Sequence, residues 1–182
     1  MAIFHGTSIP TGATEDYLLE KSCRFNDDDS ASMNRTFGTP TNAKIGTLSF
    51  WCKLGKTTDE SQAIMQEHLA NKFWVGFDNN ASGNYTLGVY LGNNGTKQVR
   101  NTTRFFRDHN NWYHITLAID TTDGSASERL KLYVNGELVT DFTTNNTINQ
   151  NIDVFTNVVH YIASYSGGGE FFDGYLAEVN FI

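Results

Sequence analysis

Apolar and polar residues alternate along much of this chain, which is typical of β-strands that bury one face. The alternation is clearest in residues 47–54 and 112–119. In the first segment the apolar side chains share even numbers: Leu48, Phe50, Cys52 and Leu54. In the second they share odd numbers: Tyr113, Ile115, Leu117 and Ile119. Because neighbouring side chains on a strand point to opposite faces, each segment predicts one face in a hydrophobic core.

Turn-forming residues punctuate the rest of the sequence. Asn135 and Gly136 fit a two-residue hairpin turn because both tolerate positive φ. This turn sets the register of the flanking strands and places Val134 opposite Glu137. Further strands are expected at residues 62–67, 73–77, 85–92 and 98–106, with two more around a loop at residues 167–169. The pattern predicts an all-β fold, a two-sheet antiparallel jelly-roll sandwich.

The two ends of the chain differ in organisation. Residues 1–20 hold no steady periodicity, so they predict an irregular N-terminal arm, followed by a single sandwich domain at residues 21–182. The arm lacks the basic and apolar parts of a signal peptide, and no stretch of the chain is apolar enough to span a membrane. We therefore expect neither export by a leader nor membrane insertion.

Charge and cysteine content narrow the choice of partners. The chain carries 13 Lys and Arg against 20 Asp and Glu, a net charge of −7, and has no basic cluster. This balance argues against nucleic-acid binding, which needs a positive surface. Cys23 and Cys52 lie in apolar-alternating segments without metal-ligand spacing, so buried thiols are the favoured interpretation and a disulfide between them is the alternative.

Several motifs, in order and spacing, resemble the laminin G-like branch of the concanavalin A-like lectin/glucanase superfamily. The motifs are Leu48–Lys53, Trp112–Asp120, Leu130–Val139 and Phe172–Phe181. Together with Arg24–Ser30 and Asn34–Thr36, they are most similar to modules in structural and appendage proteins of tailed bacteriophages. The resemblance implies a jelly-roll sandwich that binds glycans or proteins without catalysis. Ala177 stands where many relatives have an acidic residue, which weakens any transfer of a metal site.

No catalytic residues are expected. A retaining glucanase on this scaffold needs two carboxylates about 5 Å apart, which an E-x-D-x-x-E run supplies on one strand face. No such run occurs, and four glutamates stand isolated in the sequence: Glu128, Glu137, Glu170 and Glu178. An inactive glucanase-like domain remains a minor alternative.

Glycan binding needs an aromatic surface beside amide or carboxylate groups, because the CH faces of a sugar stack on rings while its hydroxyls seek polar partners. The candidate glycan-binding residues are Trp74, Asn80, Tyr85, Tyr165 and Phe171. Each of these aromatic residues could instead fill the core.

A structural calcium ion is the one cofactor that the sequence suggests. Ca²⁺ prefers several oxygen ligands from flexible turns, and relatives of this fold often carry one at a rim of the sandwich. The candidate ligands are Asn26, Asp27, Asp28, Asp29 and Asp173. Acidic turns are also commonly only solvated, and the register of an EF-hand loop is absent.

These features predict a non-enzymatic structural protein of a bacteriophage virion, made in the host cytoplasm, that decorates the capsid or forms part of a head or tail appendage. Its expected partners are capsid or tail subunits and other copies of itself, with a trimer plausible, and host cell-surface glycans are a further candidate. The alternative is a lectin-like module of a tail fibre that binds host polysaccharide.

Overall fold

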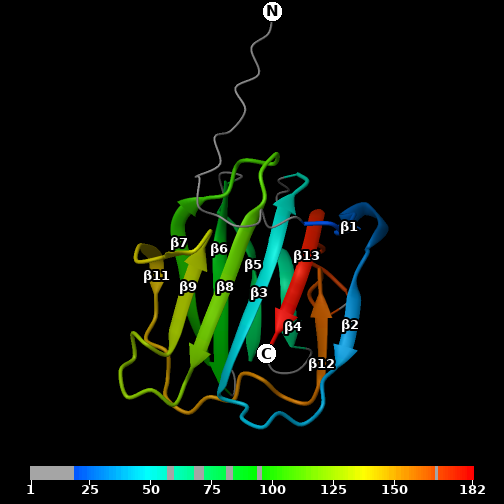
Figure 1. Cartoon of the computed structure of the whole chain (residues 1–182). Coiled ribbons are helices and arrows are strands. Elements are labelled where there is room, and N and C mark those ends of the chain that lie inside the picture. Colours follow the sequence, from blue (N-terminus) through cyan, green and yellow to red (C-terminus); the bar gives the residue numbers. More distant parts are fainter. Residues whose placement is uncertain (1–18, 57–59, 68–71, 81–83, 94–95, 167) are drawn as a thin grey trace, which may run out of the picture.

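The computed structural model describes residues 19–56, 60–67, 72–80, 84–93, 96–166 and 168–182. Two antiparallel sheets are stacked face to face (Figure 1). Sheet A has the strand order β1 (Cys23–Phe25), β13 (Gly174–Phe181), β3 (Ile45–Leu54), β8 (Tyr113–Asp120), β9 (Leu130–Val134) and β10 (Glu137–Leu138). Sheet B has the order β11 (Phe142–Asn145), β7 (Thr96–Phe105), β6 (Asn84–Asn93), β5 (Phe73–Asn80), β4 (Gln62–Glu67), β12 (Val159–Ile162) and β2 (Met33–Thr36). The predicted two-sheet jelly roll is confirmed.

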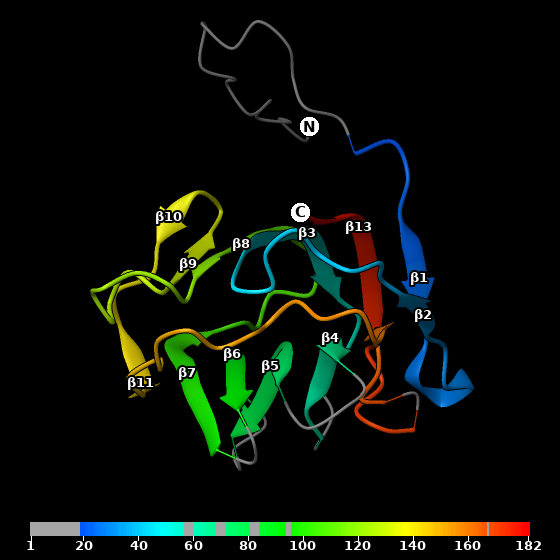
Figure 2. The same ribbon diagram turned by 90° about the horizontal axis from the view of Figure 1, so that it is seen from below.

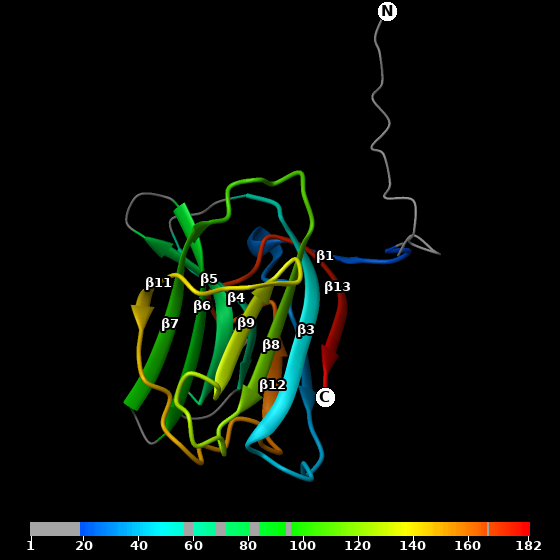
Figure 3. The same cartoon turned by 60° about the vertical axis from the view of Figure 1, so that its left-hand side comes forward.

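The hairpin registers follow from the turn chemistry. Between β9 and β10, Asn135 and Gly136 both adopt positive φ, at 52° and 82°, and Glu137 pairs with Val134 as predicted. The chain passes repeatedly between the two layers, which Figure 3 shows side by side with β3 and β13 in one layer and β5 to β7 in the other. The last two strands, β12 and β13, belong to different sheets, so the segment between them bridges the layers.

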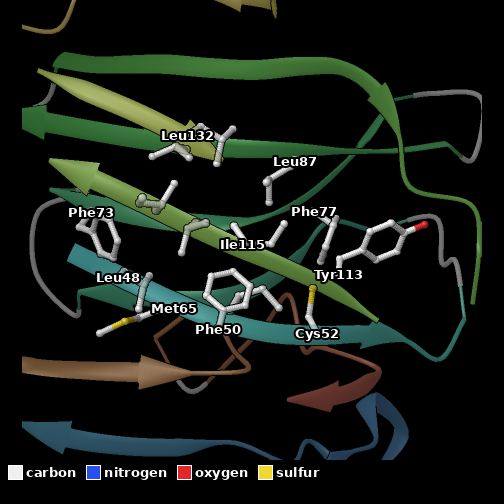
Figure 4. Packing of buried hydrophobic residues seen from close by; sticks show 14 of the residues in the cluster. Leu48, Phe50, Cys52, Met65, Phe73, Phe77, Leu87, Tyr113, Ile115 and Leu132 are labelled. Atoms are coloured by element: carbon white, nitrogen blue, oxygen red, sulfur yellow. The ribbon is translucent and has the colours of Figure 1, made fainter. Parts of the chain in front are cut away.

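The core lies between the sheets and is built from alternate residues of their strands (Figure 4). From sheet A, Phe50, Cys52 and Ile115 point toward Phe73 and Phe77 of sheet B, and all five are fully buried. Burying one such apolar side chain contributes roughly 1.5–3 kcal/mol, so the alternating strands supply most of the driving force for this fold. The core faces predicted for residues 47–54 and 112–119 are confirmed.

One end of the sandwich is closed by an irregular segment, residues 146–158, which runs from β11 to β12 (Figure 2). It buries four apolar side chains against the core: Ile148, Ile152, Val154 and Phe155. Its backbone carbonyls find side-chain donors, because the Arg129 guanidinium donates to the Ile148 oxygen and the Thr121 hydroxyl to the Ile152 oxygen, each at 2.7 Å. A buried loop is stable only when its backbone polar groups are paired in this way.

The cysteine prediction is half right. Both thiols are free, so the alternative disulfide is excluded, but only Cys52 is buried whereas Cys23 on the edge strand β1 is exposed. The acidic turn after β1 forms a short 3-10 helix, η1 (Asp27–Asp29). Most of the predicted N-terminal arm lies outside the described residues, and no helix among the described residues is long and apolar enough to cross a membrane.

Candidate functional site

The outer face of sheet B carries an aromatic cluster centred on Trp74 of β5. Phe73 and Val75 point into the core, so Trp74 points outward. The indole lies across two paired glycines, Gly76 of β5 and Gly88 of β6: a side-chain carbon added at either would lie 2.7 or 3.1 Å from an indole atom. Tyr90 stacks on the indole, with ring centres 4.4 Å apart and planes 18° apart. Trp74 is therefore only 4% exposed and is held rigidly on the sheet surface.

A loop between β12 and β13 folds over this cluster. Its residues Ala163, Ser166 and Glu170 have left-handed φ values of 66°, 48° and 46°. Such conformations cost non-glycine residues of order 1 kcal/mol each and persist only where the surroundings fix them. Here the Ser166 amide donates to the Gln66 side-chain oxygen at 2.7 Å, and the Ala63 amide donates to the Glu170 carbonyl at 2.8 Å. The strained loop is thus tied to β4, and strain of this kind concentrates at functional sites.

Two carboxylates anchor the cluster. The Trp74 indole N–H donates to Oε2 of Glu170 at 2.9 Å. Asp78 accepts hydrogen bonds from the Tyr90 hydroxyl, from the Asn101 amide at 2.9 Å and from the Ser61 hydroxyl at 3.2 Å. These three donors fix the position of the Asp78 carboxylate beside the Tyr90 hydroxyl.

The cluster shifts the pKa of two of its members. Burial raises the pKa of Glu170, and the nearby charges of Asp78 and Glu60 raise it further, while the Trp74 hydrogen bond and Lys97 oppose the change. Burial also raises the pKa of Tyr90, together with its hydrogen bond to Asp78. The Tyr90 phenol therefore stays protonated, and Glu170 is less acidic than an exposed glutamate.

Between the loop and the sheet lies a small pocket of about 30 Å³. It is lined by Trp74, Tyr90, Lys97, Tyr165 and Glu170. A cavity needs at least about 10–15 Å³ to hold a water molecule, so this pocket admits one small chemical group and excludes a whole sugar ring. The site can grip a substituent that projects from a ligand lying on the surface.

Only some of the predicted glycan-binding residues line this pocket. Trp74 and Tyr165, far apart in the sequence, meet in the pocket, and Phe171 follows Glu170 as a partly buried side chain. The expectation that Tyr85 forms a surface platform is wrong, because its ring is fully buried and its hydroxyl donates to the Glu60 carbonyl. The side chain of Asn80 lies outside the described residues.

Sequence reasoning missed three members of the site. Tyr90 could have been found, because hairpin pairing of β5 with β6 places it directly opposite Trp74. Glu170 and Lys97 carry no local signal. The description of Glu170 as isolated is wrong in space, since it shares one cluster with Asp78.

The predicted calcium ligands converge only in part. The side chains of Asp27 and Asp173 come together, as predicted. Basic and amide groups also occupy these carboxylates: Lys56 binds Asp27 at 2.8 Å and Asp28 at 3.5 Å, Arg24 binds Asp173 at 3.2 Å, and Asn26 donates to Asp29. Burial alone would raise the pKa of Asp27. The hydrogen bonds with its neighbours, of which the one from Lys56 is the strongest, outweigh burial and lower the pKa of Asp27.

Within the described part of the chain, no three His, Cys, Asp or Glu side chains are placed to hold a metal ion. Calcium binding at this rim would require the Lys56 ammonium to move away from the two aspartates. Calcium binding at this rim stays a prediction.

Two larger hollows are mainly apolar. One, of about 770 Å³, lies between the β1 and β13 edge of sheet A and the β2 and β12 edge of sheet B. The other, of about 530 Å³, lies beside residues 37–42 and the end of β13. Neither brings buried polar groups together as the Trp74 pocket does, so that pocket is the better candidate for a specific ligand.

The strand order and the surface pocket define a jelly-roll module of the lectin-like class. The chain belongs to the concanavalin A-like lectin/glucanases superfamily, whose family model matches residues 26–182. The resemblance drawn from the sequence motifs is thereby confirmed. A search of curated protein sequences found no match to this chain.

Solved structures show the same fold at low sequence identity. Tailspike protein 2 of an Escherichia coli O157:H7 bacteriophage is 14% identical, with a TM-score of 0.63 over 87% of this chain and 22% of the tailspike. Domains LG4-5 of the mouse laminin α1 chain are 8% identical, with a TM-score of 0.63 over 92% of this chain and 43% of theirs. The CBM40 domain of a Ruminococcus gnavus sialidase, bound to sialyllactose, is 17% identical, with a TM-score of 0.53 over 77% and 76% of the two chains. This chain thus spans less than half of the tailspike and laminin chains.

Proposed function

We propose that this chain is a non-enzymatic carbohydrate-binding module of a bacteriophage virion structural protein. The observation that carries the proposal is the pocket on the outer face of sheet B, in which Tyr165 and Glu170 of the strained loop meet Trp74 of β5. Aromatic rings beside a carboxylate and an ammonium group are the combination that sugars recognise, since rings stack on CH faces and the charged groups bond to hydroxyls.

The hydrogen bonds of the two carboxylates support binding without hydrolysis. Asp78 is engaged by three donors, and Glu170 by the Trp74 indole. A retaining glycosidase needs both carboxylates exposed on either side of a scissile bond. A pocket that takes only one small group cannot enclose such a bond. We expect no release of reducing ends from polysaccharides, and measurable release would refute this part of the proposal.

The assignment to a virion is supported by the sequence motifs similar to phage appendage modules and by the fold shared with a phage tailspike. On this proposal the partners are capsid or tail subunits. A host-polysaccharide lectin on a tail fibre is the second candidate, favoured by the pocket itself.

Antibody labelling of purified particles tests virion incorporation. A chain without residues 2–20 that folds but fails to join particles supports docking through the N-terminal segment.

Glycan binding is tested directly on an array of polysaccharides from bacterial surfaces. Tyr165→Ala removes a pocket wall and is expected to lower the signal of any bound glycan at least tenfold. Tyr133→Ala is the matched control, because Tyr133 is a partly exposed tyrosine on the outer face of the opposite sheet. Absence of binding by the folded parent protein, or equal binding by both variants, would refute glycan recognition at this pocket.

A further inference from the structure

The pocket lies in a locally negative environment. The charged groups that act on Glu170 are the carboxylates of Asp78 and Glu60 and the ammonium of Lys97. Counting Glu170 itself, three acidic side chains and one ammonium group lie around the site, and of these Glu170 and Lys97 line the pocket. An excess of acidic groups favours a cation over an anion, because solvent screens charges at a partly buried site less than those on an open surface.

The aromatic walls favour a cation as well. Trp74, Tyr90 and Tyr165 all line the pocket, and the face of an aromatic ring attracts positive charge. The protein already uses this attraction, since the Lys97 ammonium lies over the Tyr90 ring, 5.4 Å from its centre. Rings and a carboxylate around one small cavity are the arrangement by which proteins hold ammonium groups.

The volume of the pocket limits the size of the group. About 30 Å³ accommodates a primary ammonium, which has one heavy atom and three donors, but is tight for an acetamido group with four heavy atoms. We infer that the pocket selects a sugar that carries a free, protonated amino group, with the ammonium seated between the aromatic walls and the Glu170 carboxylate. This inference rests on the proposed function and names its ligand class.

Three oligosaccharides of equal length and linkage provide the test: hexamers of β-1,4-linked glucosamine, N-acetylglucosamine and glucose, which differ only at C2. Titration near pH 6 is followed by calorimetry and tryptophan fluorescence. We expect the glucosamine hexamer to bind at least tenfold more tightly than the other two. Glu170→Gln can still accept the Trp74 hydrogen bond, so it should fold normally yet reduce the preference to threefold or less. Glu137→Gln, an exposed change on β10, is the matched control and should leave the preference intact.

The outcomes separate the two hypotheses. Equal or tighter binding of the acetylated or neutral hexamer overturns the amino-sugar inference but leaves carbohydrate binding in place. A preference for the glucosamine hexamer that survives in Glu170→Gln shows general attraction to an acidic protein and also overturns the amino-sugar inference. The same holds if tetralysine abolishes the preference in the parent and in Glu170→Gln alike. Failure of the parent to bind these hexamers and every glycan on the array refutes the proposed function itself.

Discussion

The glycine pair beneath Trp74 offers a graded test of how the site is built. A side-chain carbon at Gly88 would lie 2.8 Å from Oδ2 of Asp78, 2.9 Å from Oδ1 of Asn101 and 3.1 Å from the indole. A carbon at Gly76 would collide with the Gln62 carbonyl oxygen and approach the Ala63 Cα at 2.9 Å. Gly124 has open space around the same position and serves as the matched control.

The magnitudes follow from what has to move. Overpacking costs about 1–3 kcal/mol, while replacing glycine by alanine recovers about 0.4–1 kcal/mol from the unfolded chain. Gly88→Ala, which displaces side chains, should therefore destabilise by about 1–2 kcal/mol. Gly76→Ala presses on backbone and should cost about 3 kcal/mol, whereas Gly124→Ala should be neutral or slightly stabilising.

Thermal unfolding followed by circular dichroism measures the series. For a domain of this size, 1 kcal/mol shifts Tm by about 2–4 °C, so Gly88→Ala is expected to lower Tm by about 2–8 °C and Gly76→Ala by more. Tryptophan emission should shift in both variants but not in Gly124→Ala. If Gly76→Ala melted with the parent, or Gly88→Ala melted above Gly124→Ala, the account of Trp74 as a ring fixed against bare backbone would be refuted.

Three further predictions concern other parts of the molecule. Burial raises the pKa of Glu67, so folding favours the protonated carboxyl and the free energy of unfolding falls as pH rises from about 4.5 through the raised pKa. In urea unfolding, Glu67→Gln should therefore gain stability relative to the parent as pH rises through this range, and a difference that does not change with pH would contradict this. Burial likewise raises the pKa of the Cys52 thiol, so a thiol reagent should label only Cys23 in the native protein and both cysteines in guanidinium; rapid native labelling of both would be the opposite result. Calcium added after chelation should release heat and raise Tm if the Asp27 rim binds it, more strongly in Lys56→Met, and absence of both signals ends the calcium hypothesis.

The sequence predicted the strands better than the site. Period-two alternation predicts that Leu48 and Ile115 are buried, because the pattern can be recognised from the adjacent residues of the same strand alone. The edge strand β2 escaped notice, since all of its residues are exposed and it has no apolar face to reveal. The buried segment at residues 146–158 escaped for a different reason: its irregular backbone is held by Arg129 and Thr121, which lie on other parts of the chain.

The site was predicted in fragments because its contacts are long-range. Trp74 and Glu170 are hydrogen bonded although 96 positions separate them in the sequence, and the residues next to Glu170 do not predict this contact. Tyr85 and Tyr90 lie on the same strand, but one faces the core and the other the surface, and this follows only from the parity of β6. Composition alone could not tell a packed tyrosine from an exposed one.

The bridging position of the β12–β13 segment makes the pocket dependent on both layers of the sandwich. The segment is held at one end by the pairing of β12 with β4 and β2 in sheet B and at the other end by the pairing of β13 with β3 and β1 in sheet A. A change that loosens either pairing would free one end of the segment that carries Tyr165 and Glu170. Ligand affinity would then report the integrity of both sheets as well as the identity of the residues that line the pocket.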